Sequence, residues 1–145
     1  MTEQSKALEN ISEELLTLIR ASVEMGLASI EGDEDMTPIF NNPISIIVLD
    51  TKTIEEARAT VQKVIQSGTI ERGVLIYNGR VTLPTGERHR LLLLEGYESG
   101  QDTIVRFNQY YRPPVKAGFF GKKRPLERIG RLKFMPASIK VKEIQ

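Results

Sequence analysis

The period of the hydrophobic pattern changes along this chain, and this change most constrains the fold. In residues 4–25 and 53–68, apolar residues recur at spacings of three and four, the period of an α-helix. From residue 74 onward, apolar residues alternate or run together in short stretches bounded by turn residues, which is typical of β-strands. We therefore expect an α+β protein, in which the helices pack on a sheet.

The first helix is expected over residues 4–25 and holds much of the acidic content of the N-terminal half. Ser5 is a suitable N-cap, and Gly26 is expected to end the helix. One stripe of this helix is apolar and consists of Leu8, Ile11, Leu15, Leu18, Ile19 and Val23. Residues 1–26 are expected to form either a helical arm or a helix packed on the sheet.

A β-α-β unit is expected next. A short strand at residues 36–40 is followed by an Asn-Asn-Pro turn and a second strand at 44–49. The second strand is almost entirely apolar, which predicts burial on both faces. Thr53 and Glu56 form a capping box that starts the second helix, and Gly68 is expected to end it.

The second half predicts an antiparallel meander. Asn78-Gly79 lies between two alternating apolar segments, 74–77 and 80–83, and predicts a two-residue hairpin turn. Further strands are expected at residues 89–97, 103–112 and 132–135, and residues 139–145 are expected to form a further strand or a tail. Residues 113–131 are expected to form an irregular basic segment. The whole chain, residues 1–145, is expected to be one domain with a single sheet and helices on one of its faces.

The charges are divided between the two halves of the chain. Residues 1–71 carry a net charge of −8 and residues 72–145 a net charge of +9, although the whole chain has only +1. Such an asymmetry indicates an acidic or a basic interaction surface. Of the 15 Lys and Arg residues in the second half, 7 lie in residues 116–133.

Several chemistries are disfavoured by the composition. The chain has no cysteine, which excludes disulfides and thiolate chemistry. The first ten residues lack a basic segment followed by an apolar one, and the longest apolar runs have four residues, against about 20 for a membrane span. We therefore expect a soluble cytoplasmic protein that does not contact a membrane.

The basic segment is the best candidate for a binding site. Its Lys and Arg side chains can neutralise phosphates, and its two adjacent aromatic residues can stack on bases or fill a pocket in a partner protein. A solvated loop anchored by its aromatic residues is the structural alternative. The candidate binding residues are Lys116, Phe119, Phe120, Lys122, Lys123, Arg124, Arg128 and Arg131.

Catalysis is weakly supported. His89 is the only histidine, and a catalytic role would require an orienting carboxylate and a nucleophile beside it. No phosphate-binding glycine loop or serine nucleophile motif is present. The acidic run at residues 31–35 lacks the spacing of a calcium loop and is expected to be solvated. We expect no catalytic residues, no metal and no cofactor.

Three short stretches resemble a group of small bacterial proteins. These stretches are Tyr77-Asn78-Gly79-Arg80-Val81-Thr82, Tyr111-Arg112-Pro113 and Arg128-Ile129-Gly130, within residues 36–135. Chains of that group show a Tyr-Asp-Gly hairpin, a strand that ends near Tyr-x-Pro, and a basic tail. This chain has Asn78 at the position of the Asp. The resemblance implies a bacterial protein and carries no activity, because none is known for the group.

Three functions therefore remain open. The first is a non-enzymatic protein-interaction module that binds a second copy, expected as a homodimer with the acidic half of one copy facing the basic half of another, or a different protein. In an intramolecular version, the acidic face of the first helix lies near the basic tail of the same chain. The second is binding of single-stranded nucleic acid through residues 116–133. The third is an enzyme that uses carboxylates and His89.

Overall fold

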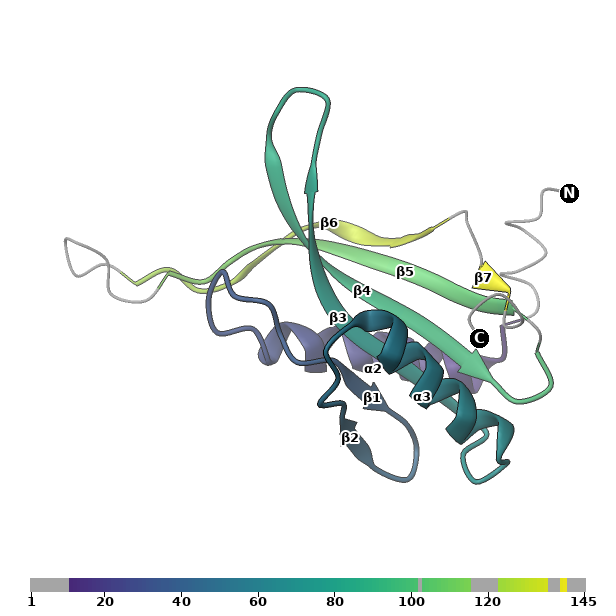
Figure 1. Cartoon of the computed structure of the whole chain (residues 1–145). Coiled ribbons are helices and arrows are strands. Elements are labelled where there is room, and N and C mark those ends of the chain that lie inside the picture. Colours follow the sequence, from purple (N-terminus) through teal and green to yellow (C-terminus); the bar gives the residue numbers. More distant parts are fainter. Residues whose placement is uncertain (1–10, 102, 116–122, 136–138, 141–145) are drawn as a thin grey trace, which may run out of the picture.

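The protein has an α+β fold, as the hydrophobic pattern predicts. A computed structural model describes residues 11–101, 103–115, 123–135 and 139–140 of the 145. Six strands form an antiparallel sheet in the order β2-β1-β3-β4-β5-β6, and β7 pairs with β5 beside it (Figure 1). The elements are α2 (Glu13–Ala28), β1 (Ile39–Asn41), β2 (Ile46–Val48), α3 (Ile54–Gln66), β3 (Arg72–Thr82), β4 (Arg88–Glu98), β5 (Thr103–Arg112), β6 (Glu127–Phe134) and β7 (Ile139–Lys140).

Helix α2 packs on the sheet and continues past the predicted stop. Ser12 caps it by accepting a hydrogen bond from the Leu15 amide at 3.1 Å, whereas Ser5 lies outside the described residues. Gly26 is inside the helix, and a Cβ there would lie 2.8 Å from side-chain atoms of Ile76 and Leu92. Gly26 therefore allows α2 to approach the sheet closely, and it does not end the helix.

The expected β-α-β unit is present with one strand inserted in it. Strand β1 pairs antiparallel with both β2 and β3, so β2 and β3 run in the same direction on either side of it. Helix α3 connects them. Its capping box forms as predicted, because the Glu56 amide donates to Thr53 Oγ1 at 3.2 Å and the Glu56 carboxylate accepts from the Lys52 amide at 3.1 Å. Gly68 follows the helix with φ 78°, the left-handed conformation expected after a helix end.

The two helices lie on opposite faces of the sheet, which corrects the expectation that they share one face. Helix α2 packs with Val74, Ile76, Leu92 and Leu94, whereas α3 packs with residues that alternate with these, including Leu75 and Tyr77. Figure 1 shows α3 in front of the sheet and α2 behind it. Because β3 and β4 are apolar on both faces, each face requires its own helix to exclude water.

The Asn78-Gly79 turn prediction is wrong. Both residues lie inside the 11-residue strand β3 and pair with Leu92 and Leu91, and neither has a positive φ. The hairpin instead turns at residues 83–87, where the Leu83 amide donates to the Glu87 carbonyl and Gly86 has φ 89°. The β3–β4 hairpin is therefore much longer than the sequence predicted.

Strand β2 is an edge strand and is not buried on both faces, in contrast to the prediction. Ile46 and Val48 are 58% and 63% exposed, and the preceding Ile44 is 69% exposed. Among the described strands, β2 has a neighbour on one side only, because β1 separates it from the rest of the sheet. The apolar run was correctly read as a strand, but its burial depends on strand order, which the run itself does not specify.

The segment predicted to be irregular, 113–131, becomes regular at its C-terminal end. Strand β6 begins at Glu127 and pairs with β5, with a bulge opposite Gln109. The Gln109 side-chain amide donates to the carbonyls of Ile129 and Gly130 at 3.3 and 3.1 Å, and Gly130 has φ 72°. A buried glutamine therefore stabilises the bulge.

Candidate functional site

The sheet divides into two ribbons at one end. The pairing of β4 with β5 stops at Arg90 and Tyr111, whereas β3 and β4 remain paired as far as Thr82 and Arg88. Strands β5 and β6 also continue as a separate ribbon, which includes an isolated bridge between Val115 and Arg124. Figure 1 shows the two ribbons diverging. We call the region between the β3–β4 ribbon and the β5–β6 ribbon the fork.

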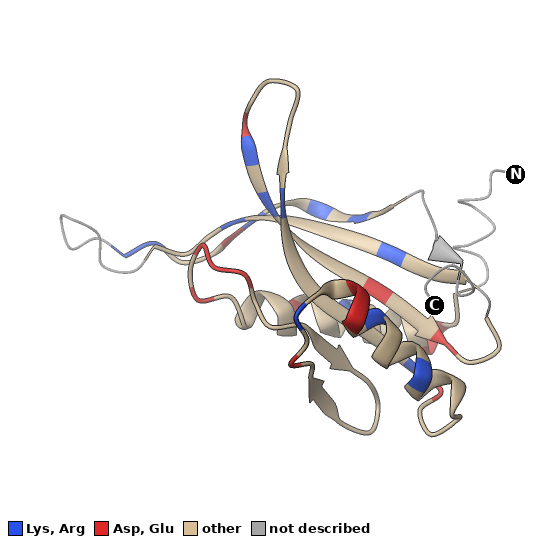
Figure 2. Cartoon of the chain, in the orientation of Figure 1, with Lys and Arg blue, Asp and Glu red and all other residues tan. Residues whose placement is uncertain are grey.

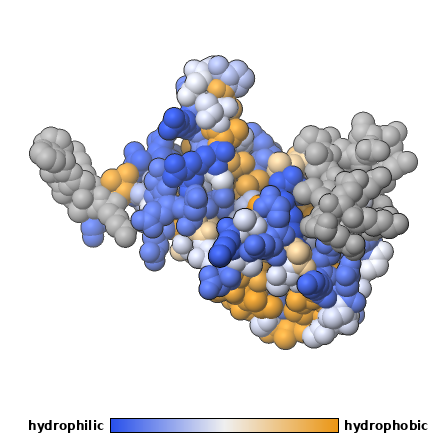
Figure 3. All heavy atoms as spheres, in the orientation of Figure 1, coloured by the Kyte–Doolittle hydropathy of each residue, from blue (hydrophilic) through white to orange (hydrophobic). Residues whose placement is uncertain are grey.

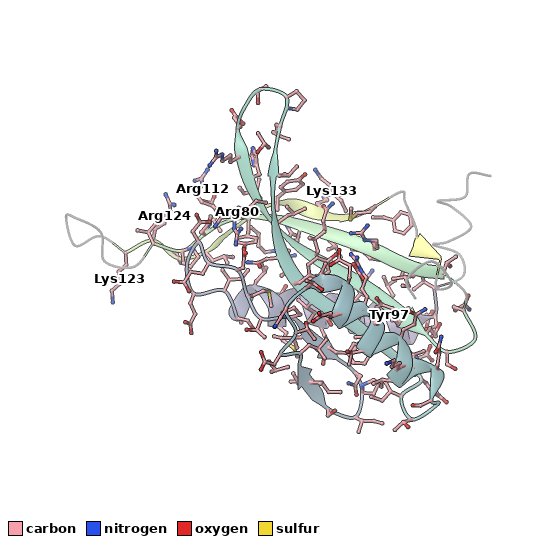
Figure 4. All side chains as sticks on the ribbon, in the orientation of Figure 1. Arg80, Tyr97, Arg112, Lys123, Arg124 and Lys133 are labelled. Carbon is pink, nitrogen blue, oxygen red and sulfur yellow. The ribbon has the colours of Figure 1, made fainter. Side chains whose placement is uncertain are left out.

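The fork contains a cavity with a basic lining. Its volume is about 480 Å³. Both ribbons contribute to it, and Figure 4 labels Arg80 on the β3–β4 ribbon and Arg112, Lys123 and Arg124 on the β5–β6 ribbon. Four arginines line the cavity, against two carboxylates. The lining residues are Asp33, Arg80, Glu87, Arg88, His89, Arg90, Tyr111, Arg112, Pro113 and Ile129.

The acidic loop, residues 31–35, contacts this fork and is not merely solvated as predicted. Arg90 is buried and its Nε lies 3.2 Å from Asp33 Oδ1, while its Nη1 lies 3.3 Å from Asp35 Oδ1. Arg80 Nη2 donates to the Asp33 carbonyl at 2.7 Å. Figure 2 shows the red loop together with the blue segments of the two ribbons. Part of the acidic half and part of the basic half therefore meet within one chain.

Asn78 positions the acidic loop. Its side-chain oxygen accepts a hydrogen bond from the Met36 amide at 2.9 Å, and its side-chain nitrogen donates to the Glu34 carbonyl at 3.1 Å. The same nitrogen donates to the Tyr111 hydroxyl at 3.1 Å. The Asn that suggested a turn therefore serves as a polar side chain within a strand, joining β3, β5 and the loop.

Several cations on the two ribbons have no carboxylate partner within the part of the chain that the structure describes. Arg112 pairs with Glu127 at 3.2 Å, and Lys133 lies over the Tyr110 ring at 5.0 Å. By contrast, the described residues offer no ion pair to four exposed side chains, those of Arg88, Lys123, Arg124 and Arg131. These cations are available to an external anion.

The binding residues predicted from the sequence lie in different places and make different contacts. Lys123 and Arg124 lie on the β5–β6 ribbon of the fork, and Arg131 is exposed on β6. Arg128 instead pairs with Glu24 of α2 at 2.6 Å and donates to Gln109 Oε1 at 3.1 Å, so it binds the helix to the sheet. The remaining predicted residues, Lys116, Phe119, Phe120 and Lys122, lie outside the described residues.

Sequence reasoning missed the arginines that line the cavity. Arg80, Arg88, Arg90 and Arg112 are distributed along three strands, and only the length of the β3–β4 hairpin brings them together. Their shared position near strand ends was the available signal. The incorrect turn at Asn78-Gly79 hid this signal, because the predicted hairpin makes Arg80 the first residue of a short strand directly after that turn.

A second group of charges is buried on the α3 face of the sheet. The Glu95 carboxylate has no exposure and lies 2.7 Å from Arg58 Nη2, which belongs to α3. It also accepts hydrogen bonds from the hydroxyls of Tyr77 and Tyr97, and Arg106 Nε lies 3.7 Å away. We call these five residues the Glu95 network.

The Glu95 network has the properties of a structural ion-pair group. The hydrogen bond to Glu95 raises the pKa of Arg58 further above its ordinary value. Burial, followed by the negative charge of Glu95, raises the pKa of Tyr77 to about 12 and also raises that of Tyr97. Both carboxylate oxygens are occupied by donors and no solvent reaches them, so Glu95 is not placed to act on a substrate.

His89 lies on the rim of the fork. Its Nε2 is 3.3 Å from Glu87 Oε2, and its ring packs edge-on against Tyr110 at 5.9 Å between centroids. The Glu87 carboxylate is 70% exposed. An acid is therefore within reach of His89, but no hydroxyl nucleophile is hydrogen-bonded to the imidazole among the described residues. The pair offers no assembled catalytic geometry.

The described residues contain neither a metal site nor a membrane-spanning helix. Among the described residues, no group of three or more His, Asp or Glu side chains is placed to hold a metal ion. The described helices include none with the length and apolar character needed to cross a bilayer. Comparisons with family models, curated proteins and solved structures found no match. The fork is therefore the feature on which a functional proposal can be based.

Proposed function

We propose that this protein is a non-enzymatic nucleic-acid-binding protein that holds the phosphate backbone in the fork. One observation carries the proposal: arginines from two diverging ribbons line a single cavity of about 480 Å³. A guanidinium group binds a phosphate through two parallel hydrogen bonds, which suits a polymer that offers phosphates at regular intervals. A cytoplasmic location is part of this proposal, because nucleic acid is available there.

The charge of the two ribbons as a whole supports the same ligand. Residues 80–90, 112–115 and 123–133 together contain nine Lys and Arg residues and two Glu residues. Lys123 and Arg124 continue the basic lining outward along the β5–β6 ribbon. A backbone that follows this ribbon would meet further cations after leaving the cavity, and each one neutralised would release a counterion.

Electrostatic pairing between copies of the chain is less well supported. Glu24 on the acidic face of α2 is paired with Arg128, and the acidic loop is paired with Arg90, all within one chain. These contacts reduce the charge complementarity that two copies could offer each other.

The proposal is tested by fluorescence anisotropy with labelled single-stranded RNA, single-stranded DNA and duplex DNA over a range of salt concentrations. We expect binding with a salt slope of roughly −2 to −4 for single strands, which corresponds to about three to five phosphate contacts. Polyglutamate serves as a non-nucleic polyanion. Equal competition by polyglutamate at equal charge would refute specificity for nucleic acid, and the absence of binding at low salt would refute the proposal altogether.

A matched pair of triple variants locates the site. Replacing Arg88, Lys123 and Arg124 by Ala removes one cation that lines the cavity and two that lie further out on the β5–β6 ribbon, and it leaves no described carboxylate unpaired. We expect at least about tenfold weaker binding and a salt slope reduced by about 2. The control replaces three exposed basic residues outside the fork, namely Arg20, Lys52 and Lys63. Equal losses in both triples would show that net charge acts without the fork.

A further inference from the structure

The edge strand β2 exposes an apolar surface. Among the described residues, Ile44, Ile46, Val48 and Val115 are the large hydrophobic side chains classed as exposed, and three of these four lie within five residues. Figure 3 shows the corresponding orange patch over β1 and β2. We call Ile44, Ile46 and Val48 the β2 strip. A contiguous exposed apolar surface of this kind indicates an interaction site.

The backbone of β2 also offers free pairing positions. The Ser45 carbonyl accepts from the Asn42 amide, and the Leu49 amide donates to the Pro38 carbonyl, so these residues direct their backbone groups toward β1. Backbone direction alternates along an antiparallel strand. The amide and carbonyl groups of Ile46 and Val48 therefore point away from the sheet, and the same two residues carry the exposed side chains.

The two edges of the sheet differ in charge. Residues 36–49 contain no charged residue, so β1, β2 and their connection are neutral. The opposite edge, β6, carries Glu127, Arg128, Arg131 and Lys133 among its eight residues. Charged side chains on an edge strand prevent unwanted pairing, and a neutral apolar edge lacks that protection. Strand β2 thus has the composition of an edge that is covered by another strand.

We propose that β2 pairs antiparallel with β2 of a second copy of this chain. In the register centred on Ile47, Ile46 of one copy lies opposite Val48 of the other, and each such pair exchanges both backbone hydrogen bonds. The two strips then lie side by side on the same face of a continuous sheet. Apolar pairs across the strands stabilise this arrangement.

A second copy fits this edge because the edge is complementary to itself. A neutral strip requires no opposite charge from its partner, and a two-fold axis brings identical apolar surfaces together. The acidic residues Glu31, Glu34 and Asp35 line a groove next to Val48. Antiparallel pairing places the Val48 end of one copy beside the Ile44 end of the other, so the two acidic loops do not face each other.

The proposed β2 dimer does not involve the fork. Its stability should not fall in high salt, whereas a dimer held by electrostatic pairing would weaken. Light scattering over a range of protein concentrations should show a dimer that persists in high salt, because the contact buries no ion pair. A chain that stays monomeric at every concentration would overturn the proposal. So would a dimer that dissociates in high salt.

Charged variants test the edge itself. Ile46→Lys combined with Val48→Lys places four like charges, two from each copy, in the proposed contact and should raise the dimer dissociation constant at least about tenfold. The control, Thr17→Lys combined with Thr60→Lys, adds the same charge at exposed helix positions. An unchanged dimer in the edge variant would overturn the proposal, as would equal weakening in the control.

A cross-link tests the register without relying on the charged variants. Because the chain has no cysteine, Ile47→Cys introduces one thiol at the centre of the proposed two-fold pairing. Side chains at such a position lie close enough for a disulfide. We expect Ile47→Cys to form a covalent dimer under mild oxidation and Thr60→Cys to remain mostly monomeric. Failure of Ile47→Cys to cross-link, or cross-linking of both variants to the same extent, would overturn the pairing of β2 with itself.

Discussion

Replacing Glu95 by Gln should strongly destabilise the protein, because the Glu95 network depends on one buried negative charge. Gln has nearly the same volume, so the substitution removes charge while leaving the packing almost unchanged. It deprives Arg58, at 2.7 Å, and Arg106, at 3.7 Å, of their described carboxylate partner. The hydroxyls of Tyr77 and Tyr97 lose a charged acceptor at the same time.

The size of the effect follows from burial. Removing one partner of a buried ion pair costs about 3–5 kcal/mol, because the other charge is left without compensation. The side chains of Arg58 and Arg106 are 15% and 18% exposed, so water can partly solvate their charges after the substitution. We therefore expect a loss of unfolding free energy at the lower end of this range, about 3 kcal/mol. A domain with a typical unfolding free energy of about 5–15 kcal/mol would stay folded, with a melting temperature about 6–12 °C lower.

The assay is urea unfolding monitored by circular dichroism, with the slope m compared between variants to confirm a common two-state transition. A variant that replaces the whole network, with Glu95→Leu, Arg58→Met, Arg106→Met, Tyr77→Phe and Tyr97→Phe, removes the three charges and the two buried hydroxyls together and should be less destabilised than Glu95→Gln. A loss below about 1 kcal/mol for Glu95→Gln would refute the argument, because it would equal an ordinary hydrogen bond. A whole-network variant less stable than Glu95→Gln would also refute it.

Two further predictions concern the packing and the pH dependence. Gly26→Ala should destabilise the protein by about 1–3 kcal/mol, because the new methyl would lie 2.8 Å from side-chain atoms of Ile76 and Leu92. The control, Gly32→Ala, should have little effect, because no atom lies within 4 Å of its new methyl. Equal unfolding free energies for the two variants would contradict the close approach of α2 to the sheet. The raised pKa of Tyr77, from 10.0 to about 12, contributes stability that is complete below pH 10.0 and is lost as the pH rises toward about 12. Tyr77→Phe should therefore show a shallower loss of unfolding free energy over this pH range than the unmodified chain, and parallel curves would contradict the assignment.

The local signals in the sequence were reliable where they described contacts between near neighbours. The capping box of Thr53 and Glu56 and the glycine after α3 both formed as predicted. These features involve hydrogen bonds or dihedral angles within a few residues, so their energies depend little on the rest of the molecule. The α+β class was predictable for a similar reason, because the period of the apolar pattern reports the local backbone geometry.

The wrong predictions involve residues whose surroundings are formed by distant parts of the chain. Asn78-Gly79 is a strong turn signal, but Asn78 gains three hydrogen bonds to the acidic loop and Tyr111 when it stays in the strand. Gly26 can end a helix, but here it makes room for the sheet. In each case a tertiary contact outweighed a local preference of about 1 kcal/mol.

The candidate site was only partly predictable. The concentration of positive charge after residue 72 is visible in the sequence, and Lys123 and Arg124, which the sequence predicts as binding residues, are exposed. Arg128 was not distinguishable from them, because its pairing with Glu24 joins residues 104 positions apart. The cavity-lining arginines required knowledge of where β4 and β5 stop pairing.

The amino-acid sequence by itself determined which parts of this protein are helical and which are extended, and the asymmetry of its charge, because periodicity, capping and composition act over short distances. Only the tertiary structure decided which charges remain available and which apolar residues remain exposed. Strand order made the apolar segment β2 an edge, and the divergence of two ribbons made a cavity from arginines on separate strands. Both outcomes depend on contacts between residues far apart in the chain, which local patterns do not specify.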